Sequence, residues 1–277
     1  MTKYDINKID DIVSYIMDEN NISDISLQKY YSLKWFLLSL QNDNFTFQKP
    51  STWSDPFEDF ISKLTNNSKG TFVNGLNITN DIYAMSTINK RSECDGMWSN
   101  FAKNNGVLIH TSPRRIIKSL VTFFLANGCC KDKKVYLNGY DSFRTFAENI
   151  KIEKITYATD KKIADFFKKL TVNSLIPSDY NTIRFEALSI KRIEYDYESE
   201  YRVFIVPNRL NIAEQHFLNA GYFKQTISKI TLSPNASPLR IKRLNSLLIN
   251  KYKIDDKIIE QSELYNIDVF KNKYGLS

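Results

Sequence analysis

A carboxylate-rich segment that leads directly into an apolar run constrains the fold of this chain more than any other feature. It occupies residues 184–207, with the sequence RFEALSIKRIEYDYESEYRVFIVP. Alternate side chains of an extended chain share a face, which predicts one row made of Glu194, Asp196, Glu198, Glu200 and Arg202. Because neighbouring carboxylates repel each other, this row is a solvated edge, a cation site, or a strand that aims one carboxylate into a cleft.

The composition is that of an ordinary globular protein. The chain has 277 residues, of which 42% are apolar and 25% charged, enough for one large core or two modest ones. Its 3 cysteines cannot form a disulfide framework, and its first residues are too acidic for a signal peptide, so we expect a cytoplasmic protein. No apolar run approaches the length of a membrane span. The formal charge of +7 is compatible with an anionic partner or substrate and does not choose between nucleic acid, nucleotide and simple solubility.

Helical and extended periodicities alternate along the chain. Helices are predicted over residues 5–19, 34–40, 97–106, 114–125, 160–170 and 238–251, and strands over residues 29–32, 45–48, 81–87, 107–110, 154–157, 227–232 and 257–260. The polar residues 65–80 are predicted to form a mobile loop or lid. This uneven alternation predicts a single mixed α+β domain over residues 27–277, with short strands in a cleft-forming sheet core and peripheral helices, and with residues 1–26 as a helix packed on it.

Familiar nucleotide-binding and hydrolase motifs are missing from the sequence. It contains no glycine-rich phosphate loop, no dinucleotide GxGxxG, no paired CxxC, no HExxH and no GxSxG. Only His110 and His216 are histidines, which leaves little material for a histidine metal centre or a serine–histidine triad. Any nucleotide would therefore be held by side chains and irregular backbone.

Four short motifs follow one another in a recognisable order. They are Lys29-Tyr30-Tyr31-Ser32, Ser54-Asp55-Pro56-Phe57-Glu58, Met97-Trp98-Ser99-Asn100-Phe101-Ala102 with Gly106-Val107, and Tyr197-Glu198-Ser199-Glu200-Tyr201-Arg202. In these motifs the chain resembles a widespread bacterial family of uncharacterised domains with K-Y-x-S, N-D-P-F-E, M-W-x-x-Y-A and Y-E-x-E-Y-R signatures. It departs from the family at Ser54, where Asn is favoured, and at Phe101, where Tyr is favoured.

The order of three segments is also similar to that of ADP-ribosyltransferases of the Arg-Ser-Glu class. Those enzymes carry a basic residue on a first strand, Ser-Thr-Ser on a later strand, and Glu-x-Glu at the entry to a final strand. The corresponding segments here are Lys29 to Ser32, Ser86-Thr87 and Glu198-Ser199-Glu200. The chain departs from that pattern because lysine stands in place of the arginine, and Ile88 in place of the second serine.

This second resemblance implies an ADP-ribosyltransferase-like fold and a reaction that consumes NAD as a substrate, by transfer or by hydrolysis. It assigns catalysis to Glu200, because a carboxylate aimed at the ribose stabilises an oxocarbenium-like transition state, and gives Glu198 the role of orienting or deprotonating the acceptor. The NAD-binding residues that it implies are Lys29, Tyr31, Ser32, Ser86, Trp98 and Arg202. Structural roles are the alternative: Arg202 as the partner of a glutamate, Trp98 as core, and Ser86 at a strand edge.

The biological setting in which such domains occur suggests a bacterial toxin or antiviral defence effector, with a nucleic-acid or protein acceptor and an inhibitory partner protein. Two other function classes stay open. The chain is alternatively a non-catalytic module that binds nucleic acid or protein through its basic helices, or a metal-dependent hydrolase or nuclease. The carboxylates available for such a metal are Asp55, Glu58, Glu198 and Glu200.

Overall fold

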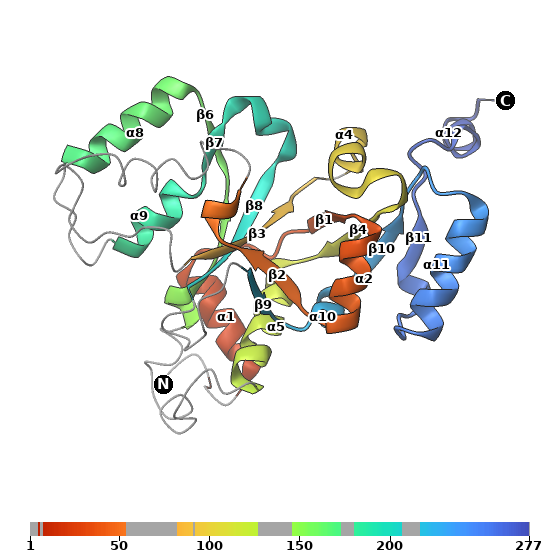
Figure 1. Cartoon of the computed structure of the whole chain (residues 1–277), viewed down its shortest axis with the longest axis horizontal. Helices are drawn as coiled ribbons and strands as arrows, with labels where there is room; N and C mark the ends of the chain where they lie inside the picture. The colour runs from red at the N-terminus through yellow and green to blue at the C-terminus, as the bar shows by residue number, and fades with distance from the viewer. Residues whose placement is uncertain are drawn as a thin grey trace.

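The fold is organised by one mixed sheet in which strands from distant parts of the chain become neighbours. In the computed structural model, the residues that are described are 5, 8–53, 82–90, 92–126, 146–172, 180–206 and 217–276. Within them, nine strands form a sheet whose main path runs β11-β10-β4-β1-β3-β2-β9, with β8 paired to β3 and β5 paired to β8. Figure 1 shows this sheet at the centre of the molecule. The chain is a single α+β domain, as its sequence predicts.

The strands are short, and all of the pairings are antiparallel except β10 with β11 and β6 with β7. Their bounds are β1 Leu27–Tyr31, β2 Phe45–Gln48, β3 Tyr83–Ile88, β4 Val107–Thr111, β5 Ile150–Lys154, β6 Thr156–Ala158, β7 Ile190–Arg192, β8 Glu200–Ile205, β9 Phe217–Ala220, β10 Lys229–Leu232 and β11 Ile259–Gln261. The two strands β6 and β7 form a small separate sheet.

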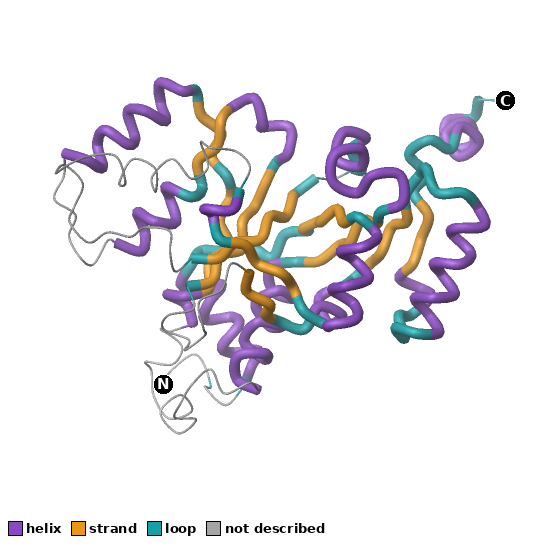
Figure 2. Tube along the Cα trace, viewed as in Figure 1, coloured by secondary structure: helices purple, strands orange, loops and turns teal. Residues whose placement is uncertain are grey.

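The helices surround the sheet on its faces and at its two ends (Figure 2). Their bounds are α1 Ile9–Glu19, α2 Leu33–Asn42, α4 Asp95–Met97, α5 Pro113–Ala126, α8 Asp160–Val172, α9 Tyr180–Ala187, α10 Phe223–Thr226, α11 Pro238–Asn250 and α12 Ile267–Tyr274. Helix α4 continues into the π-helical turn η2, Trp98–Ala102, and a 3-10 helix, η5, covers Ile193–Glu198. Among these described helices, none combines the length and apolarity needed to cross a membrane.

One face of the sheet carries the main hydrophobic core. Inward-facing residues of β1, β4, β8 and β10 pack there against α1, α5 and α10, with Phe36 of α2 and Phe223 of α10 fully buried. Helix α1 belongs to this core because Ile12, Val13 and Ile16 recur at three- and four-residue spacing and are all buried. The N-terminal helix is thus packed on the sheet.

The opposite face of the sheet is covered in two separate places. Near β1 and β4, the segment α4–η2 packs Met97, Trp98 and Ala102 against the sheet. Near β3 and β8, residues from and just after α9 pack on the sheet together with Trp53. Between these two covers, sheet residues line a cleft.

The sheet divides between β1 and β3. Strand β1 pairs with β4 along all five of its residues, whereas its register with β3 is a single position, Gln28 opposite Ile88. Beyond that point, Lys29 Nζ donates a hydrogen bond of 2.7 Å to the carbonyl oxygen of Ser86. A side-chain donor therefore satisfies a β3 carbonyl where the backbone ladder between β1 and β3 has ended.

The prediction of one extended carboxylate row is wrong. Residues 193–198 form the 3-10 helix η5, and Ser199 takes a left-handed conformation with φ of 48° before β8 begins at Glu200. Glu194 and Asp196 are exposed on η5, so the turn directs these carboxylates to solvent and separates them from Glu200. Separating like charges relieves the repulsion that a straight strand would impose on them. The predicted lid, residues 65–80, and the loop with Asp55 and Glu58 lie outside the described residues.

Candidate active site

A cleft of about 600 Å³ lies on the sheet face between the two covers. Its floor is formed by residues of β1 and β3, and η5 with the start of β8 forms one wall. Met97, Asn100 and Phe101 of the α4–η2 cover line it from one side, and Trp53 lines it from the other. The sheet splits between β1 and β3, and the helices cover this face only in part. Polar sheet residues therefore line a concave surface, which is the usual setting of a ligand site.

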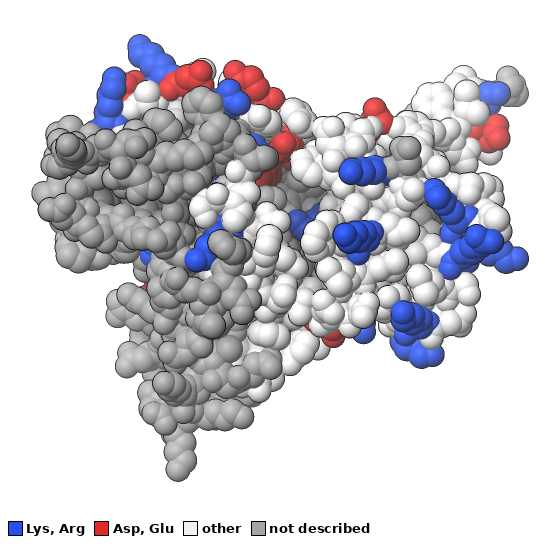
Figure 3. Space-filling model, in the orientation of Figure 1, with Lys and Arg blue, Asp and Glu red and all other residues white. Residues whose placement is uncertain are grey.

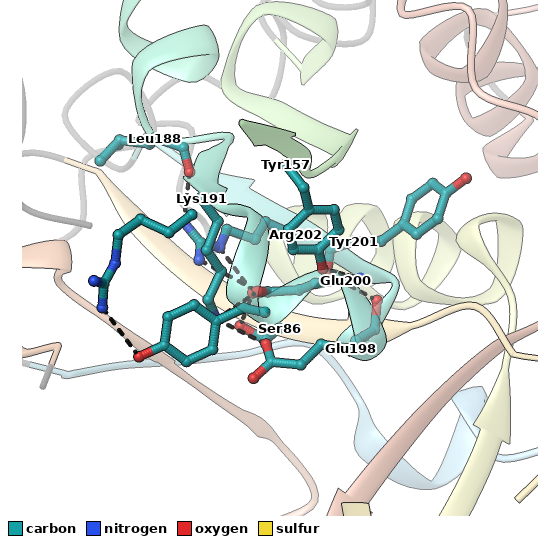
Figure 4. Close-up of polar contacts among 11 residues, drawn as sticks. Ser86, Tyr157, Leu188, Lys191, Glu198, Glu200, Tyr201 and Arg202 are labelled. Carbon is teal, nitrogen blue, oxygen red and sulfur yellow. Dashed lines mark hydrogen bonds and ion pairs between the residues drawn. The ribbon is translucent and has the colours of Figure 1, made fainter. Parts of the chain in front are cut away.

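Glu200 is the centre of the polar contacts in this cleft (Figure 4). It is only 3% exposed, and its Oε1 accepts hydrogen bonds from Ser86 Oγ at 2.5 Å and from Arg202 Nε at 2.8 Å. Its Oε2 accepts weaker bonds from Arg202 Nη2 and Lys191 Nζ, both at 3.3 Å. The backbone N–H of Glu200 donates to the hydroxyl of Tyr157 at 2.9 Å, which fixes the first residue of β8.

The charges around Glu200 keep it ionised. Burial by itself raises the pKa of the Glu200 carboxyl, but the charge and hydrogen bonds of Arg202, with those of Lys191 and Ser86, lower the pKa below its usual range. Two cations thus hold a carboxylate that is nearly withdrawn from water. A charged, oriented carboxylate at a cleft surface can stabilise positive charge that develops on a ligand.

Lys191 joins the two glutamates of the Glu-x-Glu segment. Its ammonium lies 2.7 Å from Glu198 Oε2 and 3.3 Å from Glu200 Oε2, and all three side chains line the cleft. Glu198 is buried at the end of η5, and its side chain comes to the same ammonium as that of Glu200 although Ser199 between them is left-handed. The two carboxylates therefore share one cation, whose charge offsets the repulsion between them.

Lys29 brings a further cation to the cleft floor. Its ammonium bonds the carbonyl oxygen of Ser86 and lies 5.3 Å from the centre of the Tyr31 ring. Burial lowers the pKa of Lys29 to about 8, and the nearby Glu200 charge opposes this shift. Lys29 is therefore a cation whose charge changes just above neutral pH.

The structure brings four of the eight predicted site residues together in the cleft: Lys29, Ser86, Glu198 and Glu200. The other four, Tyr31, Ser32, Trp98 and Arg202, are not among the described residues that line it. Tyr31 points into the main core, where its ring lies 5.7 Å from that of Phe223. Its neighbour Tyr30 faces the cleft instead, because side chains alternate along β1. Lys29 starts on the Tyr31 side of the strand, and its long side chain brings the ammonium to Ser86 and the cleft.

The contacts of Trp98 and Arg202 match the structural alternatives for these two residues. Trp98 is 1% exposed, packs edge-on against Tyr30, and donates from Nε1 to Glu93 Oε2 at 2.9 Å. Arg202 is equally buried. It donates to Glu200 through Nε and Nη2, and its Nη1 donates to the Leu188 carbonyl oxygen at 2.6 Å. Both side chains are thus engaged with other residues of the protein, and neither is among the described residues that line the cleft. Ser32 occupies the N-cap position of α2, away from the cleft lining.

Sequence reasoning missed Lys191, Tyr157 and Gln28. Lys191 precedes Glu198 by seven residues, and only the reversal of the chain through η5 brings the two side chains together. Tyr157 reaches Glu200 from β6, and Gln28 immediately precedes the first motif. No periodicity in the sequence marks these three positions, because each depends on which strands become neighbours.

Comparison of the chain with protein-family models, with curated proteins and with solved structures finds no match. Both family resemblances therefore remain predictions from sequence.

Proposed function

We propose that this protein cleaves the nicotinamide–ribose bond of NAD and transfers the ADP-ribosyl group to water or to a macromolecular acceptor. The observation that carries this proposal is the Ser86–Glu200 hydrogen bond of 2.5 Å within a cleft that also holds Glu198 and Lys191. These are the serine and the paired glutamates that the sequence order singled out, and they come from β3, η5 and β8. Segments more than a hundred residues apart thus converge on one carboxylate.

The reaction uses each of these side chains in a defined way. The bond between ribose C1′ and the pyridinium nitrogen breaks, its electron pair leaves with neutral nicotinamide, and the sugar becomes an oxocarbenium ion. The Glu200 carboxylate, held by Ser86 and Arg202, faces this positive charge as it develops. A water or acceptor hydroxyl then bonds to C1′ and gives its proton to Glu198, while Lys191 holds both carboxylates in place.

The remaining cleft residues suit a dinucleotide. Lys29 supplies positive charge for the pyrophosphate. Tyr30, Trp53 and Phe101 offer aromatic surface in the cleft lining. No glycine-rich loop is needed in this arrangement, because side chains provide both the charge and the flat apolar surfaces.

Nicotinamide release is the direct test. NAD binding is measured by isothermal titration calorimetry, and nicotinamide is quantified for the wild type, Glu200→Gln and the matched control Glu260→Gln. Glu260 lies on β11, at the far edge of the sheet, and pairs with Lys229 at 2.6 Å. We expect Glu200→Gln to lower the rate by roughly 100-fold or more while it remains folded, and Glu260→Gln to keep it. Absence of NAD binding by the wild type, or release by Glu200→Gln at the wild-type rate, refutes the proposal.

A second candidate function is the binding of an anionic polymer along α11. This helix exposes Arg240, Lys242 and Arg243 and contains no acidic residue. Figure 3 shows Lys and Arg side chains over α2 and α11, with few acidic side chains among them on that face. Such a surface predicts binding to RNA or DNA that weakens steeply with salt. Filter binding at two salt concentrations tests it, and absence of binding at low salt removes this candidate.

The metal-dependent alternative uses Asp55 and Glu58, which lie outside the described residues, together with Glu198 and Glu200. Within the described ranges, no group of three or more His, Cys, Asp or Glu residues is placed to hold a metal ion. Glu198 and Glu200 are paired with Lys191 and Arg202. Nicotinamide release or nuclease activity that persists in a chelator would decide against this alternative.

A further inference from the structure

Gln28 lies in the same row of the sheet as Glu200. Gln28 of β1 stands opposite Ile88 of β3, and Ile88 stands opposite Glu200 of β8. Neighbouring strands are about 4.8 Å apart, so the backbones of Gln28 and Glu200 are separated by roughly 10 Å across three strands. All three residues line the cleft, and Ile88, which also belongs to the cluster with Met97 and Trp98 of the α4–η2 cover, lies between two polar side chains.

The Gln28 side chain has an unused acceptor. It is 4% exposed, and its Oε1 has no hydrogen-bond partner in the part of the chain that the structure describes. Buried side-chain oxygens are nearly always hydrogen-bonded, and an unmade bond at such a site is unfavourable. Of the polar groups beside it, the Tyr30 hydroxyl accepts from the Cys94 N–H at 3.0 Å and His110 Nε2 lies 3.1 Å from Thr231 Oγ1, and neither forms a hydrogen bond with the Gln28 oxygen.

We propose that Gln28 recognises the carboxamide of the nicotinamide ring, an inference that rests on the proposed cleavage of NAD. A glutamine amide offers one carbonyl acceptor and two N–H donors, which match the donors and acceptor of a primary carboxamide in two parallel hydrogen bonds. With Glu200 at the ribose, the pyridine ring lies over Ile88, and its carboxamide points along the row toward Gln28. Gln28 is then the residue that selects nicotinamide over related rings.

Selectivity follows from the hydrogen-bonding groups of the ring substituent. A 3-acetylpyridine ring keeps a carbonyl but has no N–H, so Gln28 Oε1 stays without a donor. A nicotinic acid ring presents a carboxylate oxygen to that acceptor, which is repulsive. A site whose buried polar group is left unpaired rejects an analogue strongly, and we expect the wild type to bind NAD roughly 10- to 100-fold more tightly than either analogue.

The test is the ratio of affinities for NAD and for its 3-acetylpyridine and nicotinic acid analogues, measured by calorimetry on one preparation of each variant. Because all three ligands meet the same folded protein, these affinity ratios do not depend on the folded fraction. The variants are Gln28→Met and Gln28→Leu, and the matched control is Gln48→Met, which changes a glutamine of β2 in the same cleft.

We expect both Gln28 variants to reduce the discrimination to within about 3-fold by weakening NAD binding, while Gln48→Met keeps the wild-type ratio. Gln28 variants that bind NAD and retain the wild-type ratio overturn the inference, since an ordered water would then explain the buried amide. That result leaves nicotinamide release by the wild type intact. Failure of the wild type to bind NAD is a different outcome, which removes the proposed function and this inference together.

Discussion

The Arg202–Glu200 pair provides the most demanding test of how the cleft is held together. Arg202 and Glu200 are 1% and 3% exposed, and their Nε–Oε1 distance is 2.8 Å. Removing one member of a buried pair costs about 3–5 kcal/mol, because the remaining charge is left without compensation. In Arg202→Met, Lys191 still lies 3.3 Å from Glu200 Oε2, so we expect the lower end, about 3 kcal/mol.

This loss is measurable by equilibrium urea unfolding followed by tryptophan fluorescence. The Trp53 ring centre lies 4.3 Å from the Arg202 guanidinium and reports on the site. With an m-value of about 3 kcal/mol/M, a loss of about 3 kcal/mol lowers the unfolding midpoint by roughly 1 M. The matched control is Arg240→Met on the exposed surface of α11, which we expect to change stability by less than about 0.5 kcal/mol.

Two further measurements separate the ion pair from packing. The double variant Arg202→Met with Glu200→Gln should lose less stability than the sum of the single variants, with a coupling of about 1–3 kcal/mol. The pKa of Glu200 is lowered in the folded protein, so its contribution is present above the unfolded pKa of about 4.3 and is lost as the pH falls through the folded pKa. A wild-type midpoint for Arg202→Met, or strict additivity of the two substitutions, would refute this account.

Three other predictions concern Gly106, His110 and Lys29. A Cβ at Gly106 would lie 2.2 Å from the Tyr31 carbonyl oxygen, so Gly106→Ala should destabilise the fold by about 1–3 kcal/mol in urea unfolding, whereas the control Gly96→Ala, with nothing within 4 Å, should not. Burial lowers the pKa of His110 to about 4, so between pH 6.5 and pH 4 the unfolded chain binds this proton and the folded protein does not. The free energy of unfolding should therefore fall by at most about 3 kcal/mol over this range, and His110→Gln should remove the fall. A His110 pKa near 6.5 in an NMR titration would contradict this prediction. The Lys29 pKa of about 8 predicts that NAD affinity falls as the pH rises from 7 to 9 and that Lys29→Arg abolishes this fall; equal pH dependence in both proteins would contradict it.

The sequence determined the elements of this fold better than their arrangement. Periodicity correctly placed α1, α2, α5, α8 and α11 and most of the short strands, because burying one face of a helix or strand imposes a local pattern. The α+β class followed from these elements. The predicted strand over residues 193–198 is wrong because alternating charges resemble the two-residue period of an extended strand. Repulsion between the carboxylates and the left-handed conformation of Ser199 favour a turn there instead.

Motif order also selected Glu200, Glu198, Ser86 and Lys29 as site candidates, and the cleft contains all four. The choice between Tyr30 and Tyr31 was beyond the sequence. Alternation requires adjacent strand residues to face opposite ways, but which face is left open depends on where helices cover the sheet. The α4–η2 and α9 covers leave the Tyr30 face partly open, and the main core closes the Tyr31 face.

Tertiary structure alone decided the electrostatics of the cleft. Lys191 reaches both glutamates because the chain reverses through η5. Gln28 shares a row with Glu200 because Ile88 of β3 stands opposite both of them. Strand register is set by contacts between residues distant in the chain, and a shift of one residue would turn every side chain to the other face. The sequence therefore supplied the charged residues, and the register determined which of them meet.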